Sequence, residues 1–358
     1  METLRIPVFK VLYNGKDITE DISGGLLSVE YTDKTEGNAD ELSIQLEDVD
    51  GNWVGPWYPG KGDKLSLEFG YEDTGLISAG TFEIDEIEAQ GPPDVVSIRS
   101  IAAGINKAVR TKGSQAFENQ TLKQIAQTIA SKHGMSIQGE IENVRFTRIT
   151  QNQEHDLEFL RRISEEYGHI FSVRDTKLIF TKIYDIEKGS PVVSIDRIDL
   201  RDYSIRDKTS QVFKNAQVKY HDPTDKKVKE YKTTSNTNAE GVAIDDVTQA
   251  DTLEIRTKAE NKQQAELKAR AALYRHNSKQ QEGMLSVEGN PMLVAGNNIE
   301  LTGMGVLSGK YHITESRHMI EKGSGYITQI HVKRVGYIEK VKQKPKRRKT
   351  KATYRVIS

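Results

Sequence analysis

Two segments that lie far apart in this chain share one pattern of turns and strands. Residues 60–88 read GKGDKLSLEFGYEDTGLISAGTFEIDEIE, and residues 294–318 read VAGNNIELTGMGVLSGKYHITESRH. The six residues from Gly62 (GDKLSL) align with the six from Gly296 (GNNIEL), and the seven from Gly80 (GTFEIDE) align with the seven from Gly309 (GKYHITE). Each segment therefore predicts a turn, a strand, a glycine and a second strand with the same alternation of apolar residues.

Two interpretations of this internal similarity stay open. Hairpins of similar length resemble one another, so the match can arise from hairpin geometry alone. Alternatively, the chain contains two copies of one β-barrel domain. A trimer of such a chain would present six similar units around one axis, because each polypeptide supplies two.

Period-two alternation of apolar residues runs through residues 5–99, as half-buried antiparallel strands require. The alternating positions are Val29, Tyr31, Leu42, Ile44, Leu46, Leu65, Leu67, Phe69, Phe82 and Ile84. Turn residues separate the runs, for example at residues 14–15, 50–52 and 91–93. An N-terminal β domain is therefore predicted.

The period becomes helical after Thr121. An apolar stripe follows, formed by Leu122, Ile125, Ala126, Ile129 and Ala130. Thr121 and Gln124 have the spacing of a capping box, and Gly134 is a stop signal.

A second helix is predicted over residues 154–167, followed by a small hairpin over residues 170–173 and 177–180. Its exposed face offers Glu158 to Arg162 and Arg161 to Glu165 at four-residue spacing. Two carboxylates can also serve a glycosidase, but the acidic residues here are expected to form a solvated, salt-bridged face; they are Asp156, Glu158, Glu165 and Glu166.

A third helix is predicted from a cap at Thr257 and Glu260 to about Arg275, with Leu267, Ala271 and Tyr274 inward. Strands are expected at residues 217–220 and 284–335, and the polar residues 233–247 are expected on the surface.

The predicted fold class is α+β and mainly β, with two antiparallel β-barrel domains and a small α/β domain inserted between them. We expect a first barrel over residues 1–105, the insert over 106–200 and a second barrel with one long helix over 201–338. A basic tail occupies residues 339–358.

Charge is distributed unevenly along the chain. Residues 340–358 hold nine of the 51 basic residues and no acidic one, which leaves 42 against 52 acidic residues, or about −10, for residues 1–339. The body is therefore a poor general nucleic-acid binder. The tail is either solvated or a partner-binding segment, whose candidate residues are Lys340, Lys342, Lys344, Lys346, Arg347, Arg348, Lys349 and Lys351.

No motif for catalysis or for a cofactor stands out. The chain has no Cys, which excludes disulfides and thiolate chemistry. The segment from Gly55 to Gly62 (GPWYPGKG) approaches a P-loop, but Gly62 replaces the magnesium-binding Ser or Thr. His312 and His318 are the closest histidine pair, expected on sheet faces. We predict no enzyme activity, no catalytic residue, no cofactor and no metal site.

No apolar run reaches the roughly 20 residues of a membrane span, and residues 1–14 lack the features of a signal peptide. We therefore expect no membrane segment and synthesis in the cytoplasm.

Trp53, Trp57 and Tyr58 form an aromatic cluster in a predicted loop. They are either a lid on the first barrel or a contact with a neighbouring subunit, and exposure of both indoles would favour the contact.

The sequence resembles a known family. The stretches WVGPWYPGKGDKLSLEFGYED, GTFEIDEIEAQGPPDVVSIRS, TLKQIAQTIASKHGM and QNQEHDLEFLRRISEEYGHIFSV are similar to the late control D proteins, baseplate hub proteins of contractile bacteriophage tails. The resemblance covers roughly residues 5–336. The family is also similar to the hub part of type VI secretion spike proteins.

The resemblance implies a homotrimer whose two barrels per chain form a pseudo-six-fold ring around a channel. That ring joins the tail tube, or a distal tube protein, to the central spike protein. The tape-measure protein occupies the channel, and DNA is present only in transit. The implied location is the baseplate of the virion tail, assembled in the host cytoplasm, with the spike expected as a separate protein.

Two alternatives stay open. The chain is a peptidoglycan hydrolase of the tail tip, or it is the hub of a type VI or extracellular injection system.

Overall fold

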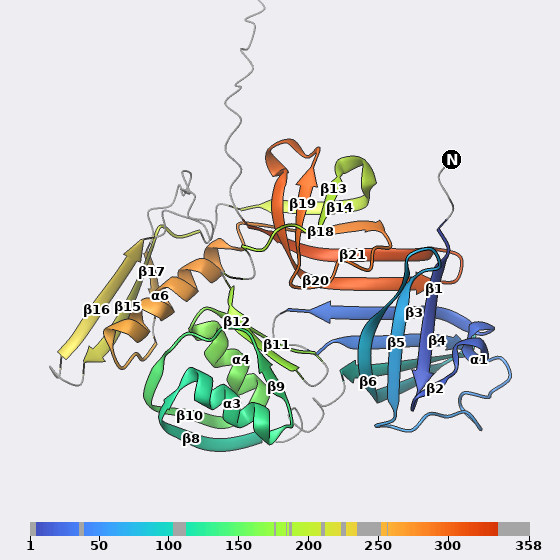
Figure 1. Ribbon diagram of the computed structural model, residues 1–358, viewed down its shortest axis with the longest axis horizontal. Helices are drawn as coiled ribbons and strands as arrows, with labels where there is room; N and C mark the ends of the chain where they lie inside the picture. Colours follow the sequence, from blue (N-terminus) through green and yellow to red (C-terminus); the bar gives the residue numbers. More distant parts are fainter. Residues whose placement is uncertain are drawn as a thin grey trace, which may run out of the picture.

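The computed structural model describes residues 5–35, 39–102, 112–174, 177–183, 185, 188–208, 212–222, 227–234, 252–255 and 257–335. The fold is α+β and mainly β, as predicted (Figure 1). The described strands form one 13-stranded sheet, one two-stranded sheet and two three-stranded sheets. Among the described residues, no helix combines the length and apolar composition that crossing a bilayer requires.

The large sheet combines strands from both halves of the chain. Its main path has the order β14-β18-β21-β20-β3-β4-β7-β6-β5-β1-β2, and β19 joins β13 to β20. The N-terminal elements are β1 (Pro7–Tyr13), β2 (Lys16–Asp17), α1 (Thr19–Ser23), β3 (Leu26–Lys34), β4 (Glu41–Glu47), β5 (Lys64–Tyr71), β6 (Gly75–Gln90) and β7 (Val95–Ala102). The later ones are β13 (Val193–Asp196), η1 (Arg197–Asp199), β14 (Leu200–Asp207), β18 (Gln281–Glu288), β19 (Asn298–Thr302), η2 (Gly305–Leu307), β20 (Gly309–Glu321) and β21 (Gly325–Arg334).

The described residues do not confirm the two closed barrels that the sequence predicts. No described sheet closes on itself, and β20 pairs antiparallel with β3, which joins the two halves in one hydrogen-bonded sheet. The alternation of apolar residues identifies strands and their buried faces, whereas closure depends on strand tilt and stagger, which alternation does not encode. The proposed domain boundaries are independent of this point and stay a proposal.

The insert holds a β-ribbon, two helices and a small sheet. Its elements are β8 (Lys112–Thr121), α3 (Leu122–Lys132), β9 (Ser136–Gln138), β10 (Arg145–His155), α4 (Asp156–Glu166), β11 (His169–Arg174) and β12 (Lys177–Lys182). The predicted capping box at Thr121 is confirmed, since its hydroxyl accepts from the Gln124 N–H while the Gln124 side chain accepts from the Thr121 N–H. The predicted hairpin is also confirmed, because β11 and β12 pair antiparallel.

One of the two ion pairs predicted on α4 is wrong. Arg161 binds Glu165 at 3.1 Å, as expected. Arg162 instead binds Glu154 at 3.0 Å and Glu166 at 3.4 Å. Glu158 accepts a hydrogen bond from the backbone N–H of His155. Glu158 lies in the first helical turn, where unpaired amides compete for a carboxylate.

The predicted cap of the third helix is also wrong. Helix α6 (Lys262–Asn277) begins at Asn261, whose side-chain oxygen accepts from the Gln264 N–H at 2.9 Å. Glu260 instead accepts from the backbone N–H groups of Thr147 and Arg148 in β10, at 2.7 and 3.1 Å. Helix α6 packs on the sheet of β15 (Asn215–Asp222), β16 (Lys227–Thr234) and β17 (Thr252–Ile255).

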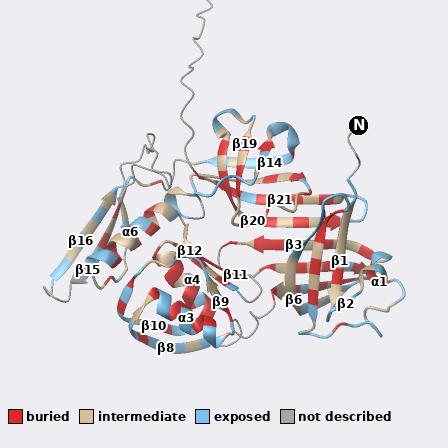
Figure 2. Cartoon of the chain, viewed as in Figure 1, coloured by how far each residue is buried: buried red, intermediate tan, exposed pale blue. Residues whose placement is uncertain are grey.

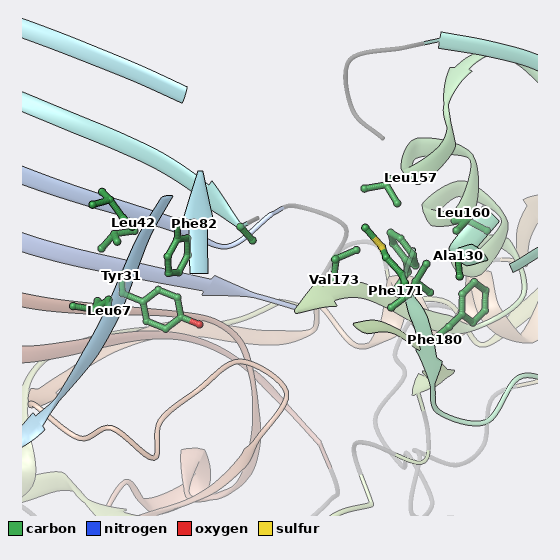
Figure 3. Close-up of a cluster of buried hydrophobic side chains, with 14 of the residues drawn as sticks. Tyr31, Leu42, Leu67, Phe82, Ala130, Leu157, Leu160, Phe171, Val173 and Phe180 are labelled. Atoms are coloured by element: carbon green, nitrogen blue, oxygen red, sulfur yellow. The ribbon is translucent and has the colours of Figure 1, made fainter. Parts of the chain in front are cut away.

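Among the described residues, buried apolar side chains form three clusters. The largest runs from the N-terminal strands into the insert, and Figure 3 shows it from Tyr31 and Phe82 to Leu160 and Phe180. A second cluster fills the C-terminal strands, and a third lies under α6. The alternation of buried and exposed residues along the large sheet is visible in Figure 2.

Candidate functional site

Each half of the large sheet contains a unit of six strands, and the two units agree in their first five strands. The N-terminal unit has the order β3-β4-β7-β6-β5-β1, and the C-terminal unit has the order β14-β18-β21-β20-β19-β13 (Figure 1). In both units the chain visits the first five positions in the same succession, apart from long insertions. The agreement therefore extends beyond the hairpins that are similar in sequence.

The register of the aligned hairpins is identical. Leu65 pairs with Phe82 in the first unit, and Ile299 pairs with Tyr311 in the second. The following strand pair carries an irregularity at the aligned position, between Ile84 and Glu86 in β6 and between Ile313 and Glu315 in β20.

The aligned turn glycines also have the same geometry. Gly62 and Gly296 have φ angles of +90° and +93°, in the region that favours glycine. The Gly62 N–H donates to the carbonyl of Ile84 at 2.8 Å, and the Gly296 N–H donates to the carbonyl of Ile313 at 2.9 Å. These bonds anchor each turn to the same residue of the next strand.

The equivalence includes strands whose sequences show no similarity. The pairing of β3 with β4 shifts register between Leu26 and Ser28, and the pairing of β14 with β18 shifts between Leu200 and Asp202. An ion pair is also repeated, since Lys34 binds Glu41 and Lys208 binds Glu282. Hairpin geometry alone does not produce these matches, so the chain contains a structural repeat.

Beyond the five strands that correspond, the two units differ in their sixth strand. Strand β1 runs antiparallel to β5, whereas β13 runs parallel to β19.

Within the chain the two units meet where β20 pairs with β3. The pairs run from Glu315 opposite Lys34 to Glu321 opposite Ser28. Arg317 of β20 forms an ion pair with Glu30 of β3 across this junction. Aromatic rings pack beneath it, with the His318 ring 4.8 Å from Phe69 and 5.9 Å from Tyr31.

The histidines expected on sheet faces lie in β20, and both are fully buried. Burial lowers the pKa of His318 to about 3, and its ring hydrogen-bonds to Tyr326 at 2.7 Å and Ser316 at 3.0 Å. Burial, reinforced by Lys333, also lowers the pKa of His312 to about 3. No cluster of metal-binding side chains occurs in the described part of the chain. Both side chains pack inside the sheet.

The acidic helix residues do not all lie on a solvated face. Asp156 is only 4% exposed, and its carboxylate binds Lys132 and His133 at 2.7 Å and Gln151 at 2.9 Å. These contacts outweigh the desolvation of the carboxylate and hold its pKa below the usual value. The first position of α4 turns this side chain toward the end of α3, which helical periodicity alone did not indicate.

The aromatic loop between β4 and β5 is partly exposed. Trp53 packs against the largest core cluster, with its ring 5.5 Å from that of Trp57. Trp57 and Tyr58 are each 53% exposed. The buried Asp48 fixes the loop by accepting from the N–H groups of Trp53 and Val54, a clamp that the sequence analysis missed. The Asp-Val-Asp-Gly sequence before the loop is the signal that could have found it.

The tail residues predicted to bind a partner lie outside the described residues, namely Lys340, Lys342, Lys344, Lys346, Arg347, Arg348, Lys349 and Lys351. Their role stays a prediction.

The family model described as phage tail baseplate hub (GPD) matches residues 94–324 of this chain. A probable baseplate hub protein of Escherichia phage P2 is 33% identical over 199 residues, 54% of this chain and 51% of that protein. The corresponding protein of Escherichia phage 186 is 32% identical over 178 residues, 49% of this chain and 45% of that protein. The chain thus spans about half the length of the curated relatives it matches.

Solved structures show the same fold at low sequence identity. The 43 kDa tail protein of prophage MuSo2 from Shewanella oneidensis matches with a TM-score of 0.67 and 15% identity, covering 91% of this chain and 98% of that one. A tail protein from Neisseria meningitidis MC58 has the same TM-score at 12% identity, covering 92% and 97%. The E. coli c3393 protein, described as a component of the type VI secretion system, gives 0.55 at 14% identity, covering 88% and 74%.

Proposed function

Because the chain belongs to the phage tail baseplate hub (GPD) family, we propose that it is the structural hub of a contractile phage tail or tail-like particle. Three copies form a ring of six sheet units around a central channel. The ring joins the six-fold tail tube to the three-fold central spike. The tape-measure protein and later the DNA use the channel, and the site of action is the baseplate of the virion.

The repeated six-strand unit is the observation that carries this proposal. A protein that joins a six-fold partner to a three-fold partner needs a surface with both symmetries. Two equivalent units per chain supply six similar positions when three chains assemble. The repeated register shifts and ion pair support equivalence at the level of single residues.

The partner contacts belong to the same proposal. Trp57 and Tyr58 are exposed on the loop that Asp48 holds, and this exposure supports a contact with a neighbouring tail component. Trp53 packs against the core, so the condition that both indoles be exposed is met by Trp57 alone. The net positive tail after residue 339 is proposed to attach to an acidic partner or to the spike. Deleting residues 340–358 is expected to leave the fold intact and to weaken that attachment. Failure of the truncated chain to fold would contradict this role of the tail.

Light scattering on the purified chain, alone and with its spike protein, tests the assembly. The expected species is a trimer under at least one of these conditions, and a monomer under both would contradict the proposal. A hydrolase is distinguished by incubating the protein with peptidoglycan. The structural role predicts no soluble muropeptides, and their release would exclude it.

A further inference from the structure

The internal junction between the two units identifies the two sheet edges that join neighbouring chains. In the repeat, β20 is equivalent to β6, and β3 is equivalent to β14. Within one chain the second unit meets the first through β20 and β3. The edges equivalent to these two are the end of β6, in the first unit, and the outer edge of β14, in the second. They lie toward opposite ends of the strand order of the large sheet (Figure 1).

Both edges lack a strand partner in the described part of the chain. Residues 86–90 of β6 pair with β7 on one side, and the pairing of β6 with β5 stops at Glu83. Strand β14 pairs with β18 alone. Backbone N–H and C=O groups along such edges are available to a strand from another chain.

Residues along these two edges are more exposed than their equivalents at the internal junction, where a neighbouring strand covers them. At the internal junction Tyr31 is 6% exposed and Asp33 is 1% exposed. In β14 the residue equivalent to Asp33 is Asp207, which is exposed, and the residue equivalent to Tyr31 is Ile205, which is partly exposed. Tyr203 is 37% exposed, whereas the equivalent Val29 of β3 is 2% exposed. At the end of β6, Ala89 is exposed and Ile87 is half-buried, whereas the equivalent His318 and Ser316 of β20 are buried.

We propose that residues 86–90 of β6 pair antiparallel with residues 204–208 of β14 in a second copy of this chain. Transfer of the internal register sets the partners. Because Glu315 lies opposite Lys34, Glu86 lies opposite the partner's Lys208. Because Arg317 lies opposite Thr32, Glu88 lies opposite the partner's Arg206. This inference deepens the proposed ring, on which it rests.

The transferred register places opposite charges together. Glu86 and Glu88 face the partner's Lys208 and Arg206, and the register itself follows from the backbone pairing of β20 with β3 alone. Glu88 and Arg206 are exposed and form no ion pair within the described part of their own chain, whereas Glu86 binds Arg99 at 3.2 Å and Lys208 binds Glu282. A slip of one residue would turn every side chain to the other face and lose both pairings. Charge complementarity therefore favours this chain itself as the occupant of both edges.

The contact is head to tail, since one chain contributes β6 and the next contributes β14. Such contacts form a closed ring when the rotation between copies closes and an open filament when it does not. Closure after three copies gives the proposed hub. The register of this joint, which is the pairing of β6 in one chain with β14 in the next, and the number of copies in the assembly are therefore tested separately.

Cysteine cross-linking tests the register directly, because the chain has no Cys. Ala89 of β6 is equivalent to His318 of β20, and Ile205 of β14 is equivalent to Tyr31 of β3. Because His318 lies opposite Tyr31 within the chain, Ala89 lies opposite the partner's Ile205 in the proposed pairing. Opposed residues of antiparallel strands lie about 4.5–5.5 Å apart at Cα, within disulfide reach. Ala89→Cys with Ile205→Cys is expected to give covalent dimers and trimers on non-reducing gels after mild oxidation.

Matched controls define the outcomes. Each single cysteine variant, and Ala89→Cys with Tyr203→Cys two residues out of register, should stay largely uncross-linked. If light scattering shows a trimer but Ala89→Cys with Ile205→Cys does not cross-link, the proposed pairing of β6 with β14 is wrong and the proposed ring stands. Cross-linked ladders beyond three would support the joint and overturn closure at three.

Charge reversal gives a second test on the full chain. Glu86→Lys with Glu88→Lys is expected to raise the dissociation constant of the assembly at least about tenfold, and adding Arg206→Glu and Lys208→Glu to the same chain should restore it. The control is Glu118→Lys with Glu140→Lys, exposed residues of the insert that each bind one exposed or half-exposed cation. Equal weakening by the control, or no recovery in the fourfold variant, would overturn the proposed pairing.

Discussion

His318 makes the stability of the junction between the two units depend on pH. Its ring is 2% exposed, packs between aromatic rings and has a pKa of about 3 because burial disfavours the charged form. The ordinary value is 6.5. Between pH 6.5 and 3 the unfolded chain therefore binds a proton at this residue and the folded chain does not.

The sign follows from this difference. The contribution of the neutral ring is fully present above pH 6.5 and is lost as the pH falls toward 3. Each pH unit in this window lowers the free energy of unfolding by about 1.4 kcal/mol through this one residue. From pH 7 to pH 4.5 the loss is roughly 2 to 3 kcal/mol.

Urea unfolding of the wild type and of His318→Gln at half-unit steps between pH 7 and pH 4.5 measures this contribution. The variant is expected to be less stable at pH 7, because it loses the aromatic contacts. As the pH falls, its free energy of unfolding should decrease less steeply than that of the wild type, by the slope that corresponds to one proton, about 1.4 kcal/mol per pH unit. Phe69→Leu is the control, since it weakens the same cluster without removing a titrating group. Parallel pH profiles for the wild type and His318→Gln would refute the reasoning.

Three further predictions concern other parts of the molecule. Ile84→Ala and Ile313→Ala occupy equivalent buried positions, so each should lower the free energy of unfolding by about 2–5 kcal/mol in urea titrations, and a difference above about 2 kcal/mol would contradict their equivalence. Asp156→Asn should cost about 2–4 kcal/mol, because Lys132 and His133 lose their carboxylate, and an unchanged thermal midpoint would show that the cluster is not stabilising. Trp57→Ala with Tyr58→Ala should change the stability of the isolated chain by less than about 1 kcal/mol and weaken its binding to tail components in a pull-down; wild-type binding would remove this loop from the interface.

The sequence predicts the two aligned hairpins of the repeat, because their turn residues and their alternation of apolar residues are signals contained in short segments of the chain. Gly62 and Gly296 adopt left-handed backbone angles, and each is followed by a strand whose apolar residues face the core. The equivalence of β3 with β14 has no such local signal. It appears only in the register shifts at Leu26 and Leu200 and in the repeated lysine–glutamate pair.

Helix boundaries show the same limit. Thr257 and Asn261 both have capping chemistry at one-turn spacing, and tertiary contacts of Glu260 with β10 select Asn261. The candidate joint was also not predictable, because Glu86 and Arg206 acquire a relation only through the topology of the sheet.

Electron cryomicroscopy of the assembled particle viewed along its axis tests the central claim most directly. The account predicts three chains, six similar sheet units and an opening on the axis, with β6 of each chain beside β14 of the next. A particle in which the two units of a chain occupy unrelated positions, or in which no axial opening exists, would contradict it.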